Sequence, residues 1–220
     1  KNKTTINAGN SGTLARCILG LLSSSKKKVK LIGDRSLSKR DFSRVIKPLN
    51  LFGVQIKSRN GILPLELNGS ELLRPIRFLE NKGSAQIKTC IILSAINTRG
   101  TTTIEAKKSR NHSELLLKYL NYPLSIKKTK KFDLIKIKGL HQFKSLDYKI
   151  PGDISSASFF IVLTLLSKKS ELLIKDININ PTRIGIVTIL NKMNANIKVI
   201  NKRVYKGEII GDLKVKSKSS

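Results

Sequence analysis

A pattern of about 70 residues occurs three times in this chain of 220 residues, and it constrains the fold more than any other feature. Each copy begins with a turn of small residues that opens an apolar helix, followed by a strand, a second helix and two further strands. Three arginines mark the start of the second helix, 70 and 73 residues apart: Arg40, Arg110 and Arg183. Three isoleucines mark the next strand, 70 and 71 residues apart: Ile56, Ile126 and Ile197. The spacing predicts three structural copies of one α/β unit.

Hydrophobic periodicity gives the expected extent of the helices. The first helix of each copy is predicted at residues 15–22, 87–96 and 157–166, and the second helix at residues 42–52, 114–120 and 184–193. The segment 139–148 between the second and third copies is polar and irregular. It predicts a domain boundary, with one domain region at residues 1–148 and another at 149–220.

The charge of the chain is compatible with three interpretations. The formal net charge is +29, which fits nucleic-acid binding, binding of small polyanions, or a compositional bias towards lysine. The lysines are scattered over positions expected to be exposed, and four Tyr, seven Phe and no Trp leave few platforms for stacking bases. We therefore favour compositional bias with some attraction for anions over a dedicated nucleic-acid-binding module, and expect no nucleic-acid partner.

Cysteine usage and hydropathy predict a reduced, cytoplasmic protein without a membrane partner. Cys17 and Cys90 each lie within a predicted apolar helix, and no CxxC pair accompanies them. The longest apolar run, residues 157–166, is too short to span a bilayer. No signal-peptide pattern opens the sequence. Both ends of the sequence read as cut ends within a longer protein.

The three openings of the first helices are candidate anion sites, because the start of a helix offers unpaired backbone N–H groups and a partial positive charge. Basic residues accompany them in sequence: Arg16, Arg40, Lys88 and Arg110. Guanidinium groups match phosphate and carboxylate oxygens, so the pattern favours a small, multiply charged anion. The alternative is that Gly and Ser merely start these helices. Asp153 either caps its helix or faces a substrate hydroxyl. His112 is either a general acid or base or a polar turn residue.

The residues around these openings resemble, in order and over nearly the whole chain, the 5-enolpyruvylshikimate-3-phosphate synthase family. The matching segments are Gly9-Asn10-Ser11-Gly12-Thr13 with Arg16, Gly33-Asp34-Arg35-Ser36-Leu37 with Lys39-Arg40, Ser84-Ala85-Gln86-Ile87-Lys88, Ser109-Arg110-Asn111-His112-Ser113-Glu114, Pro151-Gly152-Asp153-Ile154-Ser155-Ser156-Ala157, and Asn180-Pro181-Thr182-Arg183. Their Ser-Ala-Gln-x-Lys, Arg-x-His-x-Glu and Asn-x-Thr-Arg forms are similar to the second subclass of that family.

The resemblance implies an inside-out α/β barrel built from repeated βαβαββ-type units, three in each of two domains. The family chain is roughly twice as long as this one. The chain is therefore expected to be an internal, incomplete fragment. Residues 1–148 are expected to form the second and third units of the first domain, and residues 149–220 the first unit of the second domain.

The resemblance also implies substrates and site residues. Shikimate 3-phosphate is expected to meet Ser84, Ala85, Gln86 and Arg110, with Ser109 nearby, and phosphoenolpyruvate to meet Gly12, Arg40 and Gln86. Residues expected to line or support the cleft are Asn10, Arg16, His112 and Asp153. The acid and base residues are expected in the half that is missing, so no catalytic residue is assigned. No metal or organic cofactor is implied.

The implied reaction transfers the enolpyruvyl group of phosphoenolpyruvate to the 5-hydroxyl of shikimate 3-phosphate and releases phosphate. The fragment alone is expected to be inactive, and the full-length enzyme to be a monomer. Two alternatives stay open from the sequence. One is the related enolpyruvyl transferase that acts on a UDP-linked amino sugar, and the other is the basic nucleic-acid-binding module.

Overall fold

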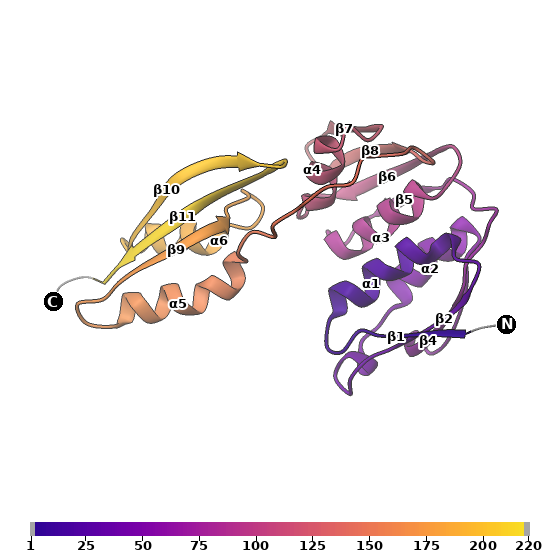
Figure 1. Cartoon of the computed structure of the whole chain (residues 1–220), viewed down its shortest axis with the longest axis horizontal. Coiled ribbons are helices and arrows are strands. Elements are labelled where there is room, and N and C mark those ends of the chain that lie inside the picture. Colours follow the sequence, from indigo (N-terminus) through magenta and orange to yellow (C-terminus); the bar gives the residue numbers. More distant parts are fainter. Residues whose placement is uncertain (1–2, 218–220) are drawn as a thin grey trace. The chain divides into compact units, whose positions relative to one another are not determined.

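A computed structural model of the chain describes residues 3–217. These residues form six α-helices, two short 3-10 helices and eleven strands, and the strands are arranged in three sheets (Figure 1). Contacts between Cα atoms divide the chain into two compact units. The first unit runs to Ser109 and resumes over Asn121–Phe143, and the second contains Arg110–Leu120 and the chain from Lys144 onwards.

The first repeat copy has the element order β1 (Lys3–Asn7), α1 (Gly12–Leu21), β2 (Lys28–Ile32), α2 (Ser43–Phe52), β3 (Gln55–Arg59) and β4 (Ile62–Asn68). The 3-10 helices η1 (Leu22–Ser24) and η2 (Leu37–Lys39) follow α1 and β2. The sheet order is β1-β2-β4-β3, with β1 parallel to β2 and the other pairs antiparallel. Helix α1 follows β1 after a short turn, and α2 follows β2 through the turn that contains η2.

The second copy repeats this order. It contains β5 (Arg77–Glu80), α3 (Ala85–Ile96), β6 (Thr101–Lys107), α4 (His112–Tyr119), β7 (Leu124–Lys128) and β8 (Phe132–Lys138). Its sheet order, β5-β6-β8-β7, again has one parallel pair at the edge. The segment that contains α4 groups with the second compact unit, although its place in the repeat is in the second copy.

The third copy contains α5 (Ile154–Leu166), β9 (Glu171–Asn178), α6 (Gly185–Lys192), β10 (Asn196–Tyr205) and β11 (Glu208–Lys216) in a sheet of order β10-β11-β9. A single parallel bridge between Gly152 and Ile177 stands where the other copies have a leading strand. The predicted α/β class and the three repeat copies are confirmed. The leading strands β1 and β5 were not predicted from hydrophobic periodicity, because both are short and largely exposed.

Helices α1, α2 and α3 lie between the two four-stranded sheets of the first unit (Figure 1). Helix α3 buries residues on all sides, as expected for a helix enclosed by its neighbours. A Cβ atom at Gly20 of α1 would lie 2.2 Å from the carbonyl oxygen of Cys90 on α3, so the two helices approach closely. Ser94 Oγ on α3 donates a hydrogen bond to the carbonyl oxygen of Gly20 over 3.3 Å. This packing holds α1 and α3 close together.

In the second unit, α5 and α6 pack against the three-stranded sheet. The buried core joins Ile154, Ala157 and Ile161 of α5 to Ile177 of β9, Val187 of α6, Ile197 of β10, and Leu213 and Val215 of β11, with Ile179 beside them. The side of α5 away from this core exposes Phe159, Leu163 and Leu166.

Among residues 3–217, no helix has the length and apolar character needed to cross a membrane.

Candidate functional site

The start of α1 gathers the first group of predicted site residues. Ser11 is the N-cap residue, and its Oγ accepts a hydrogen bond from the N–H of Leu14 over 3.1 Å. Gly12, the first residue of the helix, is buried. A Cβ atom at Gly12 would lie 2.8 Å from Nη1 of Arg16 and 3.0 Å from Nη1 of Arg40. Two guanidinium groups therefore converge on a helix start where no side chain intervenes.

Arg16 is held in place by neutral oxygen atoms. Its Nη1 donates to Oε1 of Gln86 over 3.1 Å and to the carbonyl of Gly12 over 3.3 Å. Its Nη2 donates to the carbonyl of Asp41 over 3.1 Å, and its guanidinium lies 4.9 Å from the ring centre of Phe42. Burial, followed by the charge of Arg40, lowers the pKa of Arg16 below its usual value. Both effects favour a bound anion that would offset the positive charge.

Arg40 is fixed through the turn that precedes α1. Its Nη2 donates to Oδ1 of Asn10 over 3.2 Å, and Nδ2 of Asn10 donates to Oδ2 of Asp34 over 2.5 Å. The other carboxylate oxygen of Asp34 accepts from the backbone N–H of Leu37 over 2.7 Å. That bond is the largest cause of a lowered pKa at Asp34, and the amide of Asn10 adds to it. The side chain of Asn10 therefore bridges the ionised carboxylate of Asp34 and the guanidinium of Arg40. Arg40 itself remains exposed.

Gln86 joins the starts of α1 and α3. Its Oε1 accepts from Arg16, and its Nε2 donates to Oγ1 of Thr13 over 2.8 Å. Ser84 is the N-cap residue of α3 and accepts from the N–H of Ile87 over 3.4 Å, with Ala85 as the first helical residue. The structure thus brings together Asn10, Gly12, Arg16, Arg40 and Gln86. Lys88, a predicted companion of this helix start, is buried within α3.

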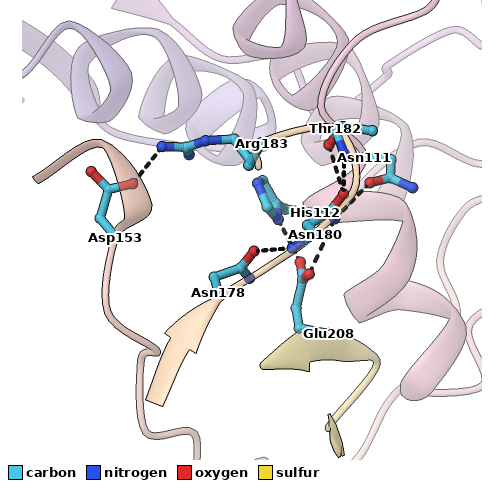
Figure 2. A network of polar contacts seen from close by, with 8 residues as sticks. All are labelled: Asn111, His112, Asp153, Asn178, Asn180, Thr182, Arg183 and Glu208. Atoms are coloured by element: carbon cyan, nitrogen blue, oxygen red, sulfur yellow. Dashed lines mark hydrogen bonds and ion pairs between the residues drawn. The ribbon is translucent and has the colours of Figure 1, made fainter. Parts of the chain in front are cut away.

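The start of α4 carries the next predicted residues, and here a second polar network forms. Ser109 and Arg110 precede the helix, and Arg110 is exposed. His112 Nδ1 lies 2.5 Å from Oε1 of Glu208 at the start of β11. Asn180 donates from Nδ2 to Oδ1 of Asn111 over 2.9 Å and to Oε2 of Glu208 over 3.2 Å. Figure 2 shows these side chains converging on Glu208.

Glu208 is ionised in this network although it is 4% exposed. Burial raises the pKa of its carboxyl, but hydrogen bonds with His112 and Asn178 outweigh burial and bring the pKa below its usual value. His112 therefore pairs with a carboxylate. This contact favours the structural interpretation of His112 over a free acid or base.

Asp153 caps α5, which is the first of the two roles predicted for it. Its Oδ2 accepts from the N–H and the hydroxyl of Ser156, each over 3.2 Å. Its Oδ1 pairs with Nη2 of Arg183, which also donates to Oγ of Ser155 over 2.7 Å. Burial raises the pKa of Asp153, but the N–H of Ser155 and the charge of Arg183 bring it below its usual value. A carboxylate of the chain itself thus occupies this helix start.

A cavity of about 370 Å³ opens beside this second network. Residues that line it include His112, Tyr148, Asp153, Asn178, Arg183 and Glu208.

Among residues 3–217, no group of three or more His, Cys, Asp and Glu side chains is arranged to hold a metal ion. The two helix starts differ in chemistry, since the arginines at the start of α1 bond to neutral oxygens, whereas α5 presents an internal ion pair.

Reasoning from the sequence missed three members of these networks: Asp34 as the partner of Asn10, and Asn180 and Glu208 as partners of Asn111 and His112. Asn180 belongs to a recognisable Asn-x-Thr-Arg segment, which was a usable signal. Glu208 follows Lys206-Gly207 in a hairpin and carries no comparable local signal. Its partner His112 is 96 residues away in the sequence.

Comparisons with known proteins show the family to which the chain belongs. Residues 1–217 match the family profile of EPSP synthase (3-phosphoshikimate 1-carboxyvinyltransferase). A 3-phosphoshikimate 1-carboxyvinyltransferase from Ruthia magnifica is 39% identical over 218 residues, which are 99% of this chain and 49% of that protein. Its counterpart from Petrotoga mobilis is 42% identical over 218 residues, covering 97% of this chain and 50% of that protein.

A solved structure gives the same result for the fold. The EPSP synthase of Acinetobacter baumannii superposes with a TM-score of 0.81 at 34% identity, covering 97% of this chain and 48% of that one. The chain thus spans about half the length of the curated relatives it matches. Because the family profile, the curated relatives and the fold agree over nearly all of its residues, the chain belongs to the EPSP synthase (3-phosphoshikimate 1-carboxyvinyltransferase) family.

Proposed function

We propose that this chain is part of a 3-phosphoshikimate 1-carboxyvinyltransferase, which transfers the enolpyruvyl group of phosphoenolpyruvate to the 5-hydroxyl of shikimate 3-phosphate and releases phosphate. The observation that carries the proposal is the convergence of Arg16 and Arg40 on Gly12 at the start of α1. Neutral oxygens hold both guanidinium groups, so their charge is available to an anionic substrate. The names of the curated relatives support the identity of that substrate.

Phosphoenolpyruvate is the proposed ligand of the α1 start. Its phosphate and carboxylate groups match the guanidinium groups of Arg40 and Arg16 and the helix N–H groups around Gly12. Gln86 completes this site, because its amide contacts Arg16 and Thr13. Asn10 supports it by orienting Arg40.

Shikimate 3-phosphate is the proposed ligand of Ser84, Ala85 and Gln86, whose backbone opens α3. We assign the same substrate to Arg110, with Ser109 beside it. His112 and Asp153 are proposed to support the site through their partners Glu208 and Arg183.

The proposed chemistry protonates C3 of phosphoenolpyruvate while the 5-hydroxyl attacks C2, and the tetrahedral intermediate then loses phosphate. Preorganised positive groups stabilise the charge that develops in such a reaction. The residues that donate and accept the protons are proposed to lie in the half of the relatives that this chain does not span. On this view the 220 residues alone bind substrates and release no phosphate. We further propose that the complete enzyme is a cytoplasmic monomer that requires neither nucleic acid nor membrane.

A chimeric enzyme tests the proposal. Residues 1–217 replace the matching segment of the Ruthia magnifica relative, and phosphate release is measured with both substrates. We expect release that depends on both shikimate 3-phosphate and phosphoenolpyruvate. A companion calorimetric titration of the 220-residue chain with each substrate separates binding from turnover. A folded chain that binds neither substrate but binds RNA in a salt-dependent manner would contradict the proposal.

A further inference from the structure

The first turn of α4 is built differently from those of α1, α3 and α5. Each of these three helices has an N-cap side chain that accepts a backbone N–H from its own first turn. Helix α4 has Asn111 at the N-cap position, a residue type well suited to capping, but its side chain makes no capping hydrogen bond. Oδ1 of Asn111 instead accepts from Nδ2 of Asn180 in the third repeat copy. The start of α4 is thus held by a distant segment rather than by its own cap.

Contacts within its own segment hold the side chain of Asn180, in addition to its bond with Asn111. It is 2% exposed, and its Oδ1 accepts from both the N–H and the hydroxyl of Thr182, each over 2.8 Å. Its Nδ2 is shared between Asn111 and Glu208. With its amide oxygen and nitrogen both engaged, Asn180 presents a single orientation to the start of α4.

Glu208 makes the second connection. One carboxylate oxygen contacts His112, the first residue of α4, and the other accepts from Asn180. Removing one partner from a buried, ionised network is costly, because the remaining group loses its solvation without compensation. Asn111 and His112 are therefore held together by one carboxylate–amide pair (Figure 2).

The hairpin that carries Glu208 also packs directly on α4. Lys206 and Gly207 have φ values of +46° and +89°, as in a tight two-residue turn between strands. A Cβ atom at Gly207 would lie 2.8 Å from the carbonyl oxygen of Leu115 and 3.1 Å from Cβ of Tyr119. Backbone packing and the polar network thus join the same two elements independently.

We infer that Glu208 and Asn180 are positioning residues for Arg110, which immediately precedes Asn111. They fix the backbone that carries Arg110. Residues of the third repeat copy therefore orient an arginine that belongs to the second copy. This inference rests on the proposed function, which assigns Arg110 to shikimate 3-phosphate. It predicts selective loss of that substrate, because the α1 start that we assign to phosphoenolpyruvate uses none of these residues.

The experiment compares Glu208→Gln with the control Glu171→Gln in the chimeric enzyme. Glu171 is an exposed carboxylate on β9 of the same sheet, paired with Lys214. We expect Glu208→Gln to raise the KM for shikimate 3-phosphate about 10-fold and to leave the KM for phosphoenolpyruvate within about 2-fold. We expect Glu171→Gln to change neither value. Equal losses for both substrates, or no difference from the control, would overturn the inference.

A double-mutant cycle with Arg110→Ala supplies the decisive readout. If Glu208 acts through Arg110, Glu208→Gln has no further effect on the KM for shikimate 3-phosphate once Arg110 is alanine. Additive effects would overturn the inference. Asn111→Ser covers the case in which Glu208→Gln fails to fold, since serine caps α4 but loses the contact with Asn180. It should reproduce the selective effect on shikimate 3-phosphate, and an unchanged KM would count against the inference.

The two proposals fail in different ways. An unmutated chimera that folds but neither binds nor uses shikimate 3-phosphate contradicts the proposed function. An active chimera in which Glu208→Gln behaves as Glu171→Gln contradicts only the positioning role.

Discussion

The place that a Cβ atom would take at Gly12 lies 2.8 Å from Nη1 of Arg16, one helical turn further along the chain. Nη1 of Arg40 lies 3.0 Å from the same place. Gly12→Ala must therefore displace the ends of two flexible side chains rather than any backbone. We expect phosphoenolpyruvate to bind about 10-fold more weakly to the 220-residue chain in calorimetric titrations, a loss of about 1.4 kcal/mol. The melting temperature should change little.

Gly185→Ala is the matched control for that variant. Gly185 is the first residue of α6, and nothing lies within 4 Å of its hypothetical Cβ atom. The same methyl group should leave phosphoenolpyruvate binding unchanged there. Similar weakening in both variants would show that the effect does not come from the two arginines.

Arg40→Ala should harm phosphoenolpyruvate use more than shikimate 3-phosphate use. Nη2 of Arg40 donates to Oδ1 of Asn10, which orients the guanidinium. Replacing Arg40 with alanine therefore removes a charged donor and disturbs few other contacts. Charge-assisted hydrogen bonds contribute about 1.5–3 kcal/mol, so we expect the KM for phosphoenolpyruvate in the chimera to rise by roughly 10- to 100-fold. The neighbouring Lys39→Ala removes a charge at the end of η2 and serves as the control. Equal losses for both substrates would contradict the assignment.

Gly20→Ala should destabilise the first unit. A Cβ atom at Gly20 would lie 2.2 Å from the carbonyl oxygen of Cys90, and a backbone atom cannot swing away as the end of a side chain does. Separating α1 from α3 should lower the free energy of unfolding by about 1–3 kcal/mol. Denaturant titration measures the loss, and Gly185→Ala again provides a helix position without such a contact. An unchanged midpoint would show that the two helices are further apart.

Truncating two residues on opposite sides of α5 should destabilise the second unit to very different extents. Ile161 is 0% exposed within the core of the second unit, whereas Leu163 is 63% exposed on the other side of the helix. Ile161→Ala should cost about 2–5 kcal/mol through lost burial and a cavity. Leu163→Ala should stay within about 0.5 kcal/mol, as surface substitutions do. Comparable losses, measured by thermal unfolding, would mean that the outer face of α5 is covered.

Acid should weaken the network around Glu208. Hydrogen bonds hold the pKa of this carboxyl below its usual value against the effect of burial, so the folded state favours the ionised form. The resulting stabilisation is present at neutral pH and is lost as pH falls below the ordinary pKa of a glutamate carboxyl, about 4.3, and the folded carboxyl gains its proton. Unfolding monitored as the pH falls through this value should show a smaller pH dependence for Glu208→Gln. An identical slope would indicate that folding does not change the pKa of Glu208.

Much of the fold was predictable because its signals are local. The apolar periodicity predicted all six helices to within a few residues at each end. The capping residues Ser11, Ser84 and Asp153 mark the starts of α1, α3 and α5 within one turn. The short strands β1 and β5 gave no such signal, because most of their residues are exposed and show little hydrophobic alternation.

The candidate site divides in the same way. The sequence by itself determined the three repeat copies, the small residues that open their first helices and the arginines beside them, because each depends on neighbours a few positions away. Only the tertiary structure decided that Arg16 bonds Gln86 across 70 residues, and that Glu208 bonds His112 across 96. Such pairs depend on how helices and hairpins pack, and no periodicity or cap within a single element records that packing.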